Sequence, residues 1–387
     1  MYAKKTEERP ILAICYDFDK TLSPDDMQAQ GYIQKVYGGD VEAFWKESNT
    51  LAKDNCMDTN LAWMFMMIKH ARGKIVPNKD NLMKYGSRVE LFPGVQEWFE
   101  RIRAYGDEQG ITVEHYIISS GLKEMIEGTS IASKGAFKCI YASSFYFDET
   151  GVPIWPAQAI NYTNKTQFLF RIEKGILDIN DSRVNDYFAP EDLRVPFRNI
   201  VYIGDSDTDI PCMKLVNANG GHAIAVYNNE SRDKTKAFKM LKENRIKHFA
   251  PTDYTEGSPL DILVKDIINR TAHNEKIERD YYRCLAELKE ADESKQAEKA
   301  KSQRINLISS LARSGSFSTT HEIVKELVAI ESWEEDEIEW LCEVALENTQ
   351  VFYILKDTDI TKFYKKLLGK MSKKTENSKK VAKEIEK

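Results

Sequence analysis

Short apolar runs alternate with helical patterns from residue 11 to about residue 270. Five of these runs are rich in β-branched and aromatic residues and predict strands, at 11–16, 113–119, 139–142, 200–203 and 223–227. Strands that alternate with helices require crossover connections, so this stretch predicts an α/β fold with a doubly wound, mostly parallel sheet. The segment FYFDETGVPIW, at 145–155, also predicts a hairpin that turns at residues 149–151.

The stretch 23–91 interrupts this alternation, because it contains no strand pattern. Asp40 and Asp58 are suited to cap two helices, the second of which reads LAWMFMMIKHAR and ends at Gly73. That second helix is apolar on nearly all sides, so we expect it at the centre of a small helical bundle. The sequence therefore predicts a helical cap, inserted into a core domain that comprises residues 1–22 and 92–270.

The pattern changes again after residue 270. Residues 271–304 are strongly charged, which is typical of a solvated connecting helix. Residues 305–368 carry amphipathic helical patterns and predict a separate helical module. The lysine-rich stretch 369–387 is polar throughout, so we expect it to be a disordered basic tail.

Three helix starts in the C-terminal module have candidate capping residues. Thr319 with Glu322, and Ser332 with Glu335, both match the spacing of a capping box. The sequence LKDTDI contains an Asp-x-Asp pair before a helical pattern, which is best explained by a helix cap at Asp357. None of these features predicts chemistry in the module.

Composition narrows the class of protein. The 387 residues are 42% hydrophobic and 30% charged, which is ordinary for a globular chain and excludes full disorder. The longest near-continuous apolar run, 61–68, is far below the roughly 20 residues of a membrane-spanning helix. The six cysteines lack metal-ligand spacing, and the N-terminal residues do not resemble a secretion signal. We therefore expect a cytoplasmic protein without a membrane partner, a zinc site or a disulfide framework.

Two aspartates stand where the first predicted strand ends. In ILAICYDFDKTL, Asp17 follows the strand directly and Asp19 comes two residues later. Ligands of open parallel sheets bind at the carboxyl ends of strands, so both carboxylates would face one crevice. There Asp17 could attack phosphorus, and Asp19 could exchange a proton with the leaving oxygen and with water. Alone, the pattern is weak evidence, because acids after strands often cap the next helix.

Groups that would bind an anion follow other predicted elements. The second strand runs into Ser119, Ser120 and Gly121 before a helix, which places hydroxyl and backbone N–H groups where a phosphate could bind. Lys165 opens the helical segment KTQFLFRI and could supply positive charge to a phosphoryl group. Each feature alone is better explained as an ordinary helix start or a surface lysine.

An acidic cluster follows the strand at 200–203. The sequence GDSDTD holds Asp205, Asp207 and Asp209, whose charges repel one another unless a cation neutralises them. Hard oxygen ligands with few dedicated side chains suit magnesium, so this cluster predicts an Mg²⁺ site.

Taken together, these features resemble the haloacid dehalogenase superfamily over residues 11 to about 265. The resemblance rests on four motifs in the expected order: DFDKT at 17–21, Ser120-Gly121, Lys165, and GDSDTD at 204–209. It is strongest for phosphoserine-phosphatase-like members, and it implies a Rossmann-like core with a mobile helical cap at 23–91.

The resemblance also implies roles for the residues. Asp17 would be the nucleophile that forms an aspartyl-phosphate, and Asp19 the general acid and base. The residues implied to hold the phosphoryl group are Ser120, Gly121 and Lys165, with Ser119 as the alternative to Ser120. The groups implied to bind Mg²⁺ are Asp17, Asp205, Asp209 and the backbone carbonyl of Asp19.

This pattern favours a magnesium-dependent phosphatase for a small phosphorylated metabolite. Asp19 argues against a dehalogenase, whose halide leaving group needs no proton, whereas a phosphomutase stays open. A closing cap favours small substrates. Asp26 lies near the position where related caps carry an acid that reads a substrate amine, although a helix cap at Asp25 or Asp26 is at least as well supported.

The C-terminal module matches no family and could mediate oligomerisation or protein binding. Two alternative functions therefore stay open. The first is a phosphatase for nucleic-acid ends or for a protein, which this module would deliver. The second is a scaffold that senses a phosphorylated ligand. The basic tail alone is weak support for a nucleic-acid partner, because such tails are more often solvated ends.

Overall fold

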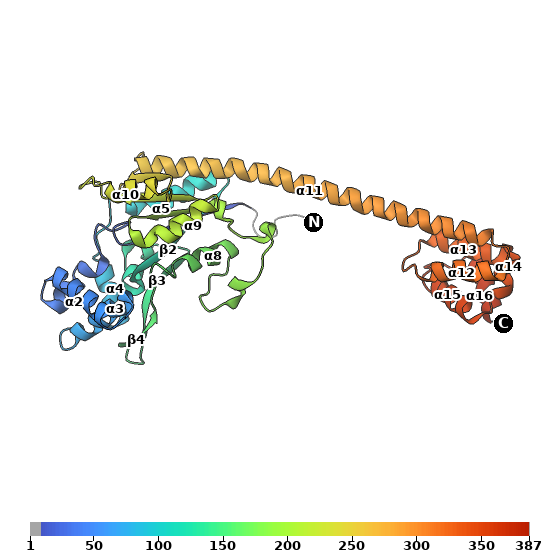
Figure 1. The fold of residues 1–387 in the computed structure, drawn as a ribbon, viewed down its shortest axis with the longest axis horizontal. Coiled ribbons are helices and arrows are strands. Elements are labelled where there is room, and N and C mark those ends of the chain that lie inside the picture. Colours follow the sequence, from blue (N-terminus) through green and yellow to red (C-terminus); the bar gives the residue numbers. More distant parts are fainter. Residues whose placement is uncertain (1–8, 387) are drawn as a thin grey trace. The chain divides into compact units, whose positions relative to one another are not determined.

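The computed structural model describes residues 9–386. The chain forms two compact units, which meet in sequence between Tyr282 and Arg283 (Figure 1). In the part of the chain that the structure describes, no helix is long and apolar enough to cross a membrane.

The first unit contains a seven-stranded sheet with the order β4-β3-β2-β1-β5-β6-β7. All neighbouring strands are parallel except β3 and β4, which form the predicted antiparallel hairpin. The strands are β1 (Ile11–Tyr16), β2 (Thr112–Leu122), β3 (Cys139–Phe147), β4 (Pro153–Gln158), β5 (Ile200–Gly204), β6 (His222–Tyr227) and β7 (His248–Pro251). Tyr16 at the end of β1 pairs with Ile117 in β2 and with Ile203 in β5, so the carboxyl ends of these three strands lie together. The predicted α/β class is confirmed.

Helices cover both faces of this sheet, as the alternation of β1 side chains requires. Leu12, Ile14 and Tyr16 join one hydrophobic core, and the intervening residues join the other. The first face is covered by α5 (Val95–Glu108) and the start of α11 (Pro259–Ala312), and the second by α8 (Thr166–Lys174), α9 (Ile210–Ala218) and α10 (Thr235–Lys242). The short elements of this unit are α6 (Lys123–Glu127), α7 (Ser130–Ser133), η2 (Ser182–Asn185), η3 (Pro190–Asp192), η4 (Phe197–Asn199) and η5 (Asp207–Asp209).

The insert between β1 and β2 is helical, as its sequence predicts. It contains η1 (Met27–Ala29), α1 (Tyr32–Tyr37), α2 (Val41–Asp54), α3 (Thr59–Ala71) and α4 (Lys79–Gly86). Asp40 and Asp58 cap α2 and α3 through their side chains. Two glycines allow α4 to approach the core closely. A Cβ atom on Gly86 would lie 1.9 Å from the Met125 carbonyl oxygen, and one on Gly128 would lie 2.1 Å from the Met83 carbonyl oxygen.

The helix that links the two units is longer than the sequence predicts. Instead of covering residues 271–304, α11 runs without interruption from Pro259 to Ala312. The side chain of Glu275, which is 3% exposed, accepts hydrogen bonds from Arg198 (3.2 Å) and Asn199 (2.9 Å) of the first unit. This part of α11 therefore belongs to the first unit, which extends to Tyr282.

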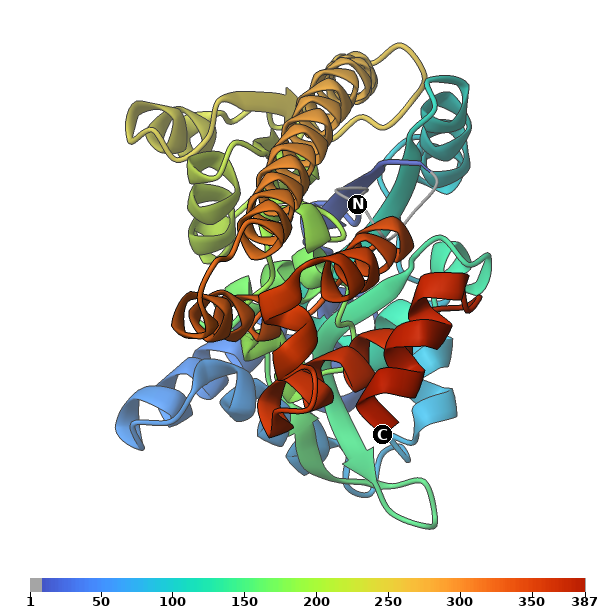
Figure 2. The ribbon, with the colours of Figure 1, turned by 90° about the vertical axis from the view of Figure 1, so that its right-hand side faces the viewer.

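The second unit is a bundle with its own hydrophobic core, formed by the end of α11 and five further helices (Figures 1 and 2). These helices are α12 (Phe317–Val328), α13 (Glu335–Glu347), α14 (Thr349–Ile354), α15 (Thr358–Leu368) and α16 (Glu376–Glu386). The prediction of a disordered tail at 369–387 is wrong for α16, whose Val381 is fully buried in this core. A single apolar face was enough to order a segment whose composition is mostly polar.

Two predicted helix starts in this unit are also wrong. Ser316, not Thr319, caps α12, and its Oγ accepts a hydrogen bond from the Thr319 backbone N–H (3.2 Å). Glu334 and Glu337, not Ser332 and Glu335, form the capping box of α13. The capping pattern recurs within a few residues in both segments, so the spacing alone could not select the start.

Candidate active site

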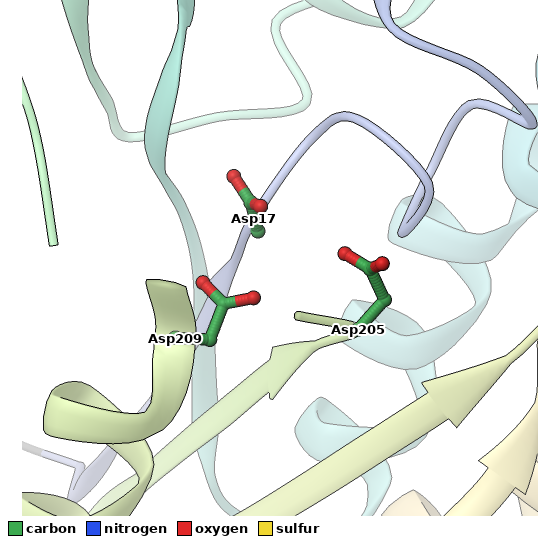
Figure 3. A group of neighbouring side chains, drawn as sticks. All are labelled: Asp17, Asp205 and Asp209. Carbon is green, nitrogen blue, oxygen red and sulfur yellow. The ribbon is translucent and has the colours of Figure 1, made fainter. Parts of the chain in front are cut away.

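Three carboxylates from two neighbouring strand ends converge in the first unit. Asp17 follows β1, and Asp205 and Asp209 follow β5; each offers an oxygen that lies within 4.8 Å of the others (Figure 3). The backbone N–H of Asp17 donates to the Ile203 carbonyl (3.0 Å), which extends the pairing of β1 with β5 up to the cluster. The adjacent parallel strands therefore position the acids that the sequence singled out.

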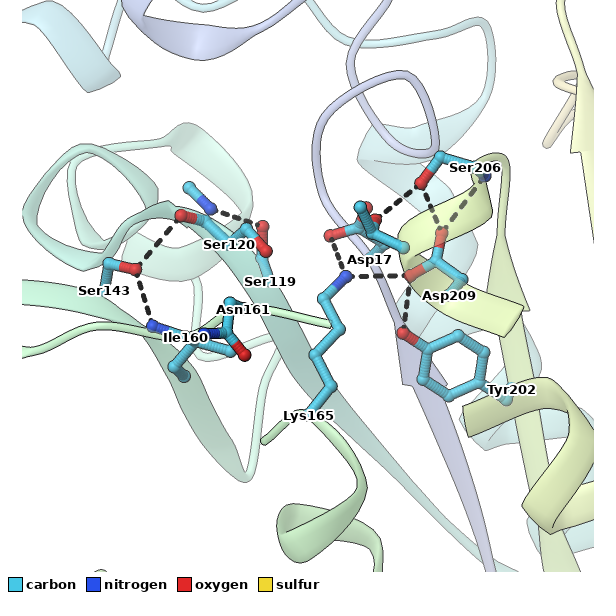
Figure 4. Close-up of polar contacts among 12 residues, drawn as sticks. Asp17, Ser119, Ser120, Ser143, Ile160, Asn161, Lys165, Tyr202, Ser206 and Asp209 are labelled. Atoms are coloured by element: carbon cyan, nitrogen blue, oxygen red, sulfur yellow. Dashed lines mark hydrogen bonds and ion pairs between the residues drawn. The ribbon is translucent and has the colours of Figure 1, made fainter. Parts of the chain in front are cut away.

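Lys165 neutralises part of this cluster. Its Nζ lies 2.8 Å from Asp209 Oδ1 and 3.2 Å from Asp17 Oδ1, and its side chain is fully buried (Figure 4). Burial by itself lowers the pKa of this lysine, but Asp17 and Asp209 outweigh that effect and raise it. Lys165 is therefore a fixed positive charge between two of the acids, as the sequence predicts for a group that opens α8.

Asp209 is held by residues that the sequence did not single out. Its Oδ1 accepts a hydrogen bond from the Tyr202 hydroxyl (2.8 Å), and its Oδ2 accepts from the backbone N–H (3.2 Å) and the hydroxyl (3.0 Å) of Ser206 (Figure 4). Tyr202 lies inside β5, where an aromatic residue predicts only core packing. Ser206 lies within GDSDTD, and a helix-capping pattern with Asp209 three residues later could have indicated it.

Two of these acids, Asp17 and Asp205, have raised pKa values. Burial raises the pKa of Asp17 to about 6, and Asp209 adds to this effect while Lys165 opposes it. Asp205 keeps some exposed surface, yet loss of surrounding water raises its pKa to about 8, and Asp209 and Asp17 contribute further. Such mutual repulsion at one site is the electrostatic condition that a bound cation relieves.

The cluster fits a magnesium ion by its chemistry. It offers three hard carboxylate oxygens from a rigid strand edge, which are ligands that Mg²⁺ prefers. Within the described residues, Asp17 Oδ1 is buried and accepts no hydrogen bond, although Lys165 lies nearby. Asp17, Asp205 and Asp209 are therefore the residues that could hold the metal.

Asp19 lies at the boundary between the core and the helical insert. Its Oδ1 accepts a hydrogen bond from the Met27 backbone N–H (2.8 Å), and a Cβ atom on Gly121 would lie 3.0 Å from its Oδ2. Loss of surrounding water raises the pKa of Asp19 well above its ordinary value, and Asp26 and Asp17 add to the shift. The structure therefore describes a carboxyl group that favours the protonated form beside the acidic cluster.

The two candidate serines differ in their surroundings. Ser119 is 1% exposed; its hydroxyl helps to lower the pKa of Asp17, and it accepts a hydrogen bond from the Gly121 N–H (3.0 Å). The backbone carbonyl of Ser120 accepts a hydrogen bond from Ser143 (3.1 Å; Figure 4). Proximity to Asp17 favours Ser119, and the choice between the two serines stays a prediction.

Asp26 does not present a free carboxylate. Its two oxygens lie 2.9 Å and 3.0 Å from Lys20 Nζ, and its side chain makes no capping hydrogen bond to η1. The capping role suggested for Asp26 is therefore not seen, and its carboxylate pairs instead with an ammonium group of the chain itself. The suggested role in reading a substrate amine stays a prediction.

The chain is similar in sequence to known proteins. Residues 14–214 match the family of haloacid dehalogenase-like hydrolases. An uncharacterized protein of Borreliella burgdorferi is 26% identical over 280 residues, which cover 66% of this chain and 95% of that protein.

Solved structures also match the chain, at low sequence identity. A phosphoserine phosphatase with an analogue of its phospho-aspartyl intermediate is 15% identical, with a TM-score of 0.40, and the match covers 66% of this chain and 99% of that chain. A probable phosphoserine phosphatase from Vibrio cholerae is 13% identical, with a TM-score of 0.45, over 70% of this chain and 69% of that chain.

Proposed function

The chain belongs to the family of haloacid dehalogenase-like hydrolases, and on that premise we propose that it is a magnesium-dependent phosphomonoesterase. The observation that carries this proposal is the position of Lys165, a buried ammonium group between Asp17 and Asp209. A buried positive charge at a strand-end carboxylate suits a reaction in which a phosphoryl group binds beside that carboxylate.

In the first half of the reaction, a carboxylate oxygen of Asp17 attacks phosphorus. A new O–P bond forms, and the bond from phosphorus to the leaving oxygen breaks. Asp19 donates its proton to that oxygen, so the product leaves as an alcohol. The raised pKa of Asp19 supports this role, because it favours the protonated form that can donate.

In the second half, the ionised Asp19 takes a proton from water. The water oxygen attacks the aspartyl-phosphate, inorganic phosphate leaves, and Asp17 is regenerated as a carboxylate. Lys165 and the hydroxyl of Ser119 would hold the phosphoryl oxygens through both halves. A magnesium ion held by Asp17, Asp205 and Asp209 would supply further positive charge to those oxygens.

We propose a small phosphorylated metabolite as the substrate, because the helical insert lies directly against the site. The Met27 N–H donates to Asp19, and a Cβ atom on Gly121 would lie 2.4 Å from the end of the Met27 side chain. A residue of the insert thus stands beside the proposed general acid, which leaves little room for a bulky leaving group.

The test is release of phosphate from p-nitrophenyl phosphate, from a panel of phosphorylated metabolites and from 3′-phosphorylated oligonucleotides. We expect turnover with Mg²⁺, highest on a small metabolite, and none after chelation. Calcium should replace magnesium poorly, because its longer and looser coordination misplaces the oxygens. Full activity after exhaustive chelation would refute the metal dependence, and preference for oligonucleotides would refute the substrate class.

A further inference from the structure

The second unit contains a groove that the chemistry above does not use. It encloses a cavity of about 230 Å³ between the end of α12 and the face of α15. Its floor is apolar and consists of Val328, Ile330, Trp333, Phe363 and Leu367. Phe363 and Leu367 are buried in the bundle core, whereas Val328 is 46% exposed. The floor is therefore built on a packed core and open at one side.

Lysines form one side of this groove. Lys362 and Lys366 lie on α15 and Lys370 follows it, and all three side chains line the cavity. Lys370 donates a hydrogen bond to the Glu331 carbonyl, but among the described residues Lys362 and Lys366 have no ion pair. Their Cα atoms are about 6 Å apart along the helix, because an α-helix rises by about 1.5 Å per residue.

The one acid in the groove is engaged elsewhere. Asp359 Oδ2 lies 3.3 Å from His321 Nδ1, which joins α15 to α12. The Asp359 carboxylate therefore contacts His321 rather than Lys362 or Lys366, and the two ammonium groups can contact a ligand.

We propose that this groove binds an acidic peptide segment of a partner protein, which inserts an apolar or aromatic side chain into the cavity. Charge complementarity selects an anionic ligand, because Lys362 and Lys366 lie along one edge and form no ion pair with any residue from 9 to 386. The apolar floor selects a side chain rather than a phosphate, since burying a phosphate there would leave its oxygens without donors. Two neighbouring lysines beside an apolar cavity are features that can recognise an acidic amphipathic segment.

Nucleic acid fits the same surface less well. Single strands are bound by extended positive grooves with several exposed aromatic rings, whereas this groove has one partly exposed ring, Trp333, at its floor. A second copy of the chain is the remaining occupant, and the experiment below separates these cases.

The proposal is tested by selecting displayed 12-residue random peptides against the full-length protein. We expect the selected peptides to share one or two large apolar residues flanked by Asp or Glu, and to bind saturably in fluorescence polarisation. Enrichment of basic peptides, or of no common pattern, would overturn the proposal.

Variants locate the binding surface. Lys362→Glu with Lys366→Glu should weaken the selected peptides at least about tenfold, which corresponds to about 1.4 kcal/mol. The matched control is Lys373→Glu with Lys374→Glu, which makes the same charge change at exposed positions outside the groove. Val328→Asp places a charge on the open part of the floor and should also weaken binding. Circular dichroism checks that each variant is folded.

The outcomes distinguish the occupants. Equal weakening by the control pair would show that only net charge matters and would overturn the proposal. If oligo-dT competes with the peptide for the groove, the ligand is nucleic acid and not a peptide. If sedimentation experiments show that the protein self-associates through the groove, the occupant is a second copy of the chain. Either result would overturn the proposal. Turnover of p-nitrophenyl phosphate should stay unchanged in all three variants, since none lies in the first unit.

Discussion

The chain contains two Asp-x-Asp pairs that look alike in sequence and differ in burial and in the element that presents them. Asp17 and Asp19 follow the apolar run ILAICY, and Asp357 and Asp359 follow the apolar run VFYIL. The first pair stands at the end of a buried parallel strand, and the second at the exposed start of the helix α15. The motif is therefore shared, whereas the secondary structure that presents it is not.

The difference shows what turns two acids into a reactive site. Asp17 is buried beside Lys165 and beside acids that follow a second strand. Few water molecules and few partner groups therefore stabilise its charge. The exposed carboxylates of Asp357 and Asp359 both contact His321 and join two helices of the bundle. The candidate active site is distinguished by charged groups that converge in a buried, water-poor site, and not by the spacing of two aspartates.

The largest expected effect separates the two pairs. Asp17→Asn keeps the size of the side chain but removes the nucleophilic charge, so turnover of p-nitrophenyl phosphate should fall by about 10⁴-fold or more. Asp357→Asn is the matched control and should leave turnover unchanged. Both variants are purified free of other phosphatases and assayed at saturating Mg²⁺. A clearly active Asp17→Asn protein would refute the covalent intermediate.

The sequence could predict the first pair because its strand is buried on both faces. An uninterrupted apolar run is then unavoidable, and the predicted range of 11–16 coincides with β1. The strand β7 was missed because it is short, lies at the sheet edge and ends in Pro251. An edge strand needs no such apolar run, so its pattern resembles that of a loop.

Other parts depend on contacts that no local pattern encodes. The hydroxyl of Tyr202 reaches Asp209 only because β5 and η5 fold against each other, and the pairing of Asp26 with Lys20 depends on the turn after β1. Likewise, the ordering of α16 depends on a core that α13 and α15 provide. The elements were therefore more predictable than the partners of individual polar side chains.

The second expected effect concerns Asp19. Removal of a general acid typically costs about 10²–10⁴-fold in rate, so Asp19→Asn should lose activity by a factor in this range on alkyl phosphates. The loss should be smaller on p-nitrophenyl phosphate, whose leaving group needs little protonation. The ratio of the two losses is the measurement, and equal losses on both substrates would rule out Asp19 as the acid.

The third effect tests the buried lysine against an exposed one. Lys165→Met leaves the Asp17 and Asp209 charges uncompensated, and breaking a buried pair costs about 3–5 kcal/mol. Lys362→Met, at an exposed position, should change the free energy of unfolding by at most about 0.5 kcal/mol. Urea denaturation followed by circular dichroism measures both. Added Mg²⁺ should restore part of the stability lost in Lys165→Met, and failure of any such rescue would count against a cation at these acids.

A smaller effect is expected at the second acidic pair. His321→Gln removes the positive charge that can face Asp357 and Asp359, and surface pairs of this kind are worth about 0–1 kcal/mol. Thermal unfolding of the second unit should therefore shift by no more than a few degrees, without any change in turnover. A change in phosphatase kinetics would show that the two acidic pairs are coupled, contrary to the contrast drawn above.

Only a small effect on turnover is expected when the second pair is removed altogether. A chain ending at Tyr282 keeps Glu275 and its hydrogen bonds to Arg198 and Asn199, so the first unit should stay folded and hydrolyse p-nitrophenyl phosphate within about twofold of the full-length rate.

A chain ending at residue 272 is the informative comparison, because it leaves the Asn199 side chain without its buried acceptor. Loss of one such hydrogen bond costs about 1–3 kcal/mol, so this shorter chain should unfold at lower urea concentration while its turnover at 25 °C is retained. If the chain ending at Tyr282 loses turnover on the small substrate, the C-terminal helices contribute to the active site, and the two acidic pairs do not belong to separable parts of the protein.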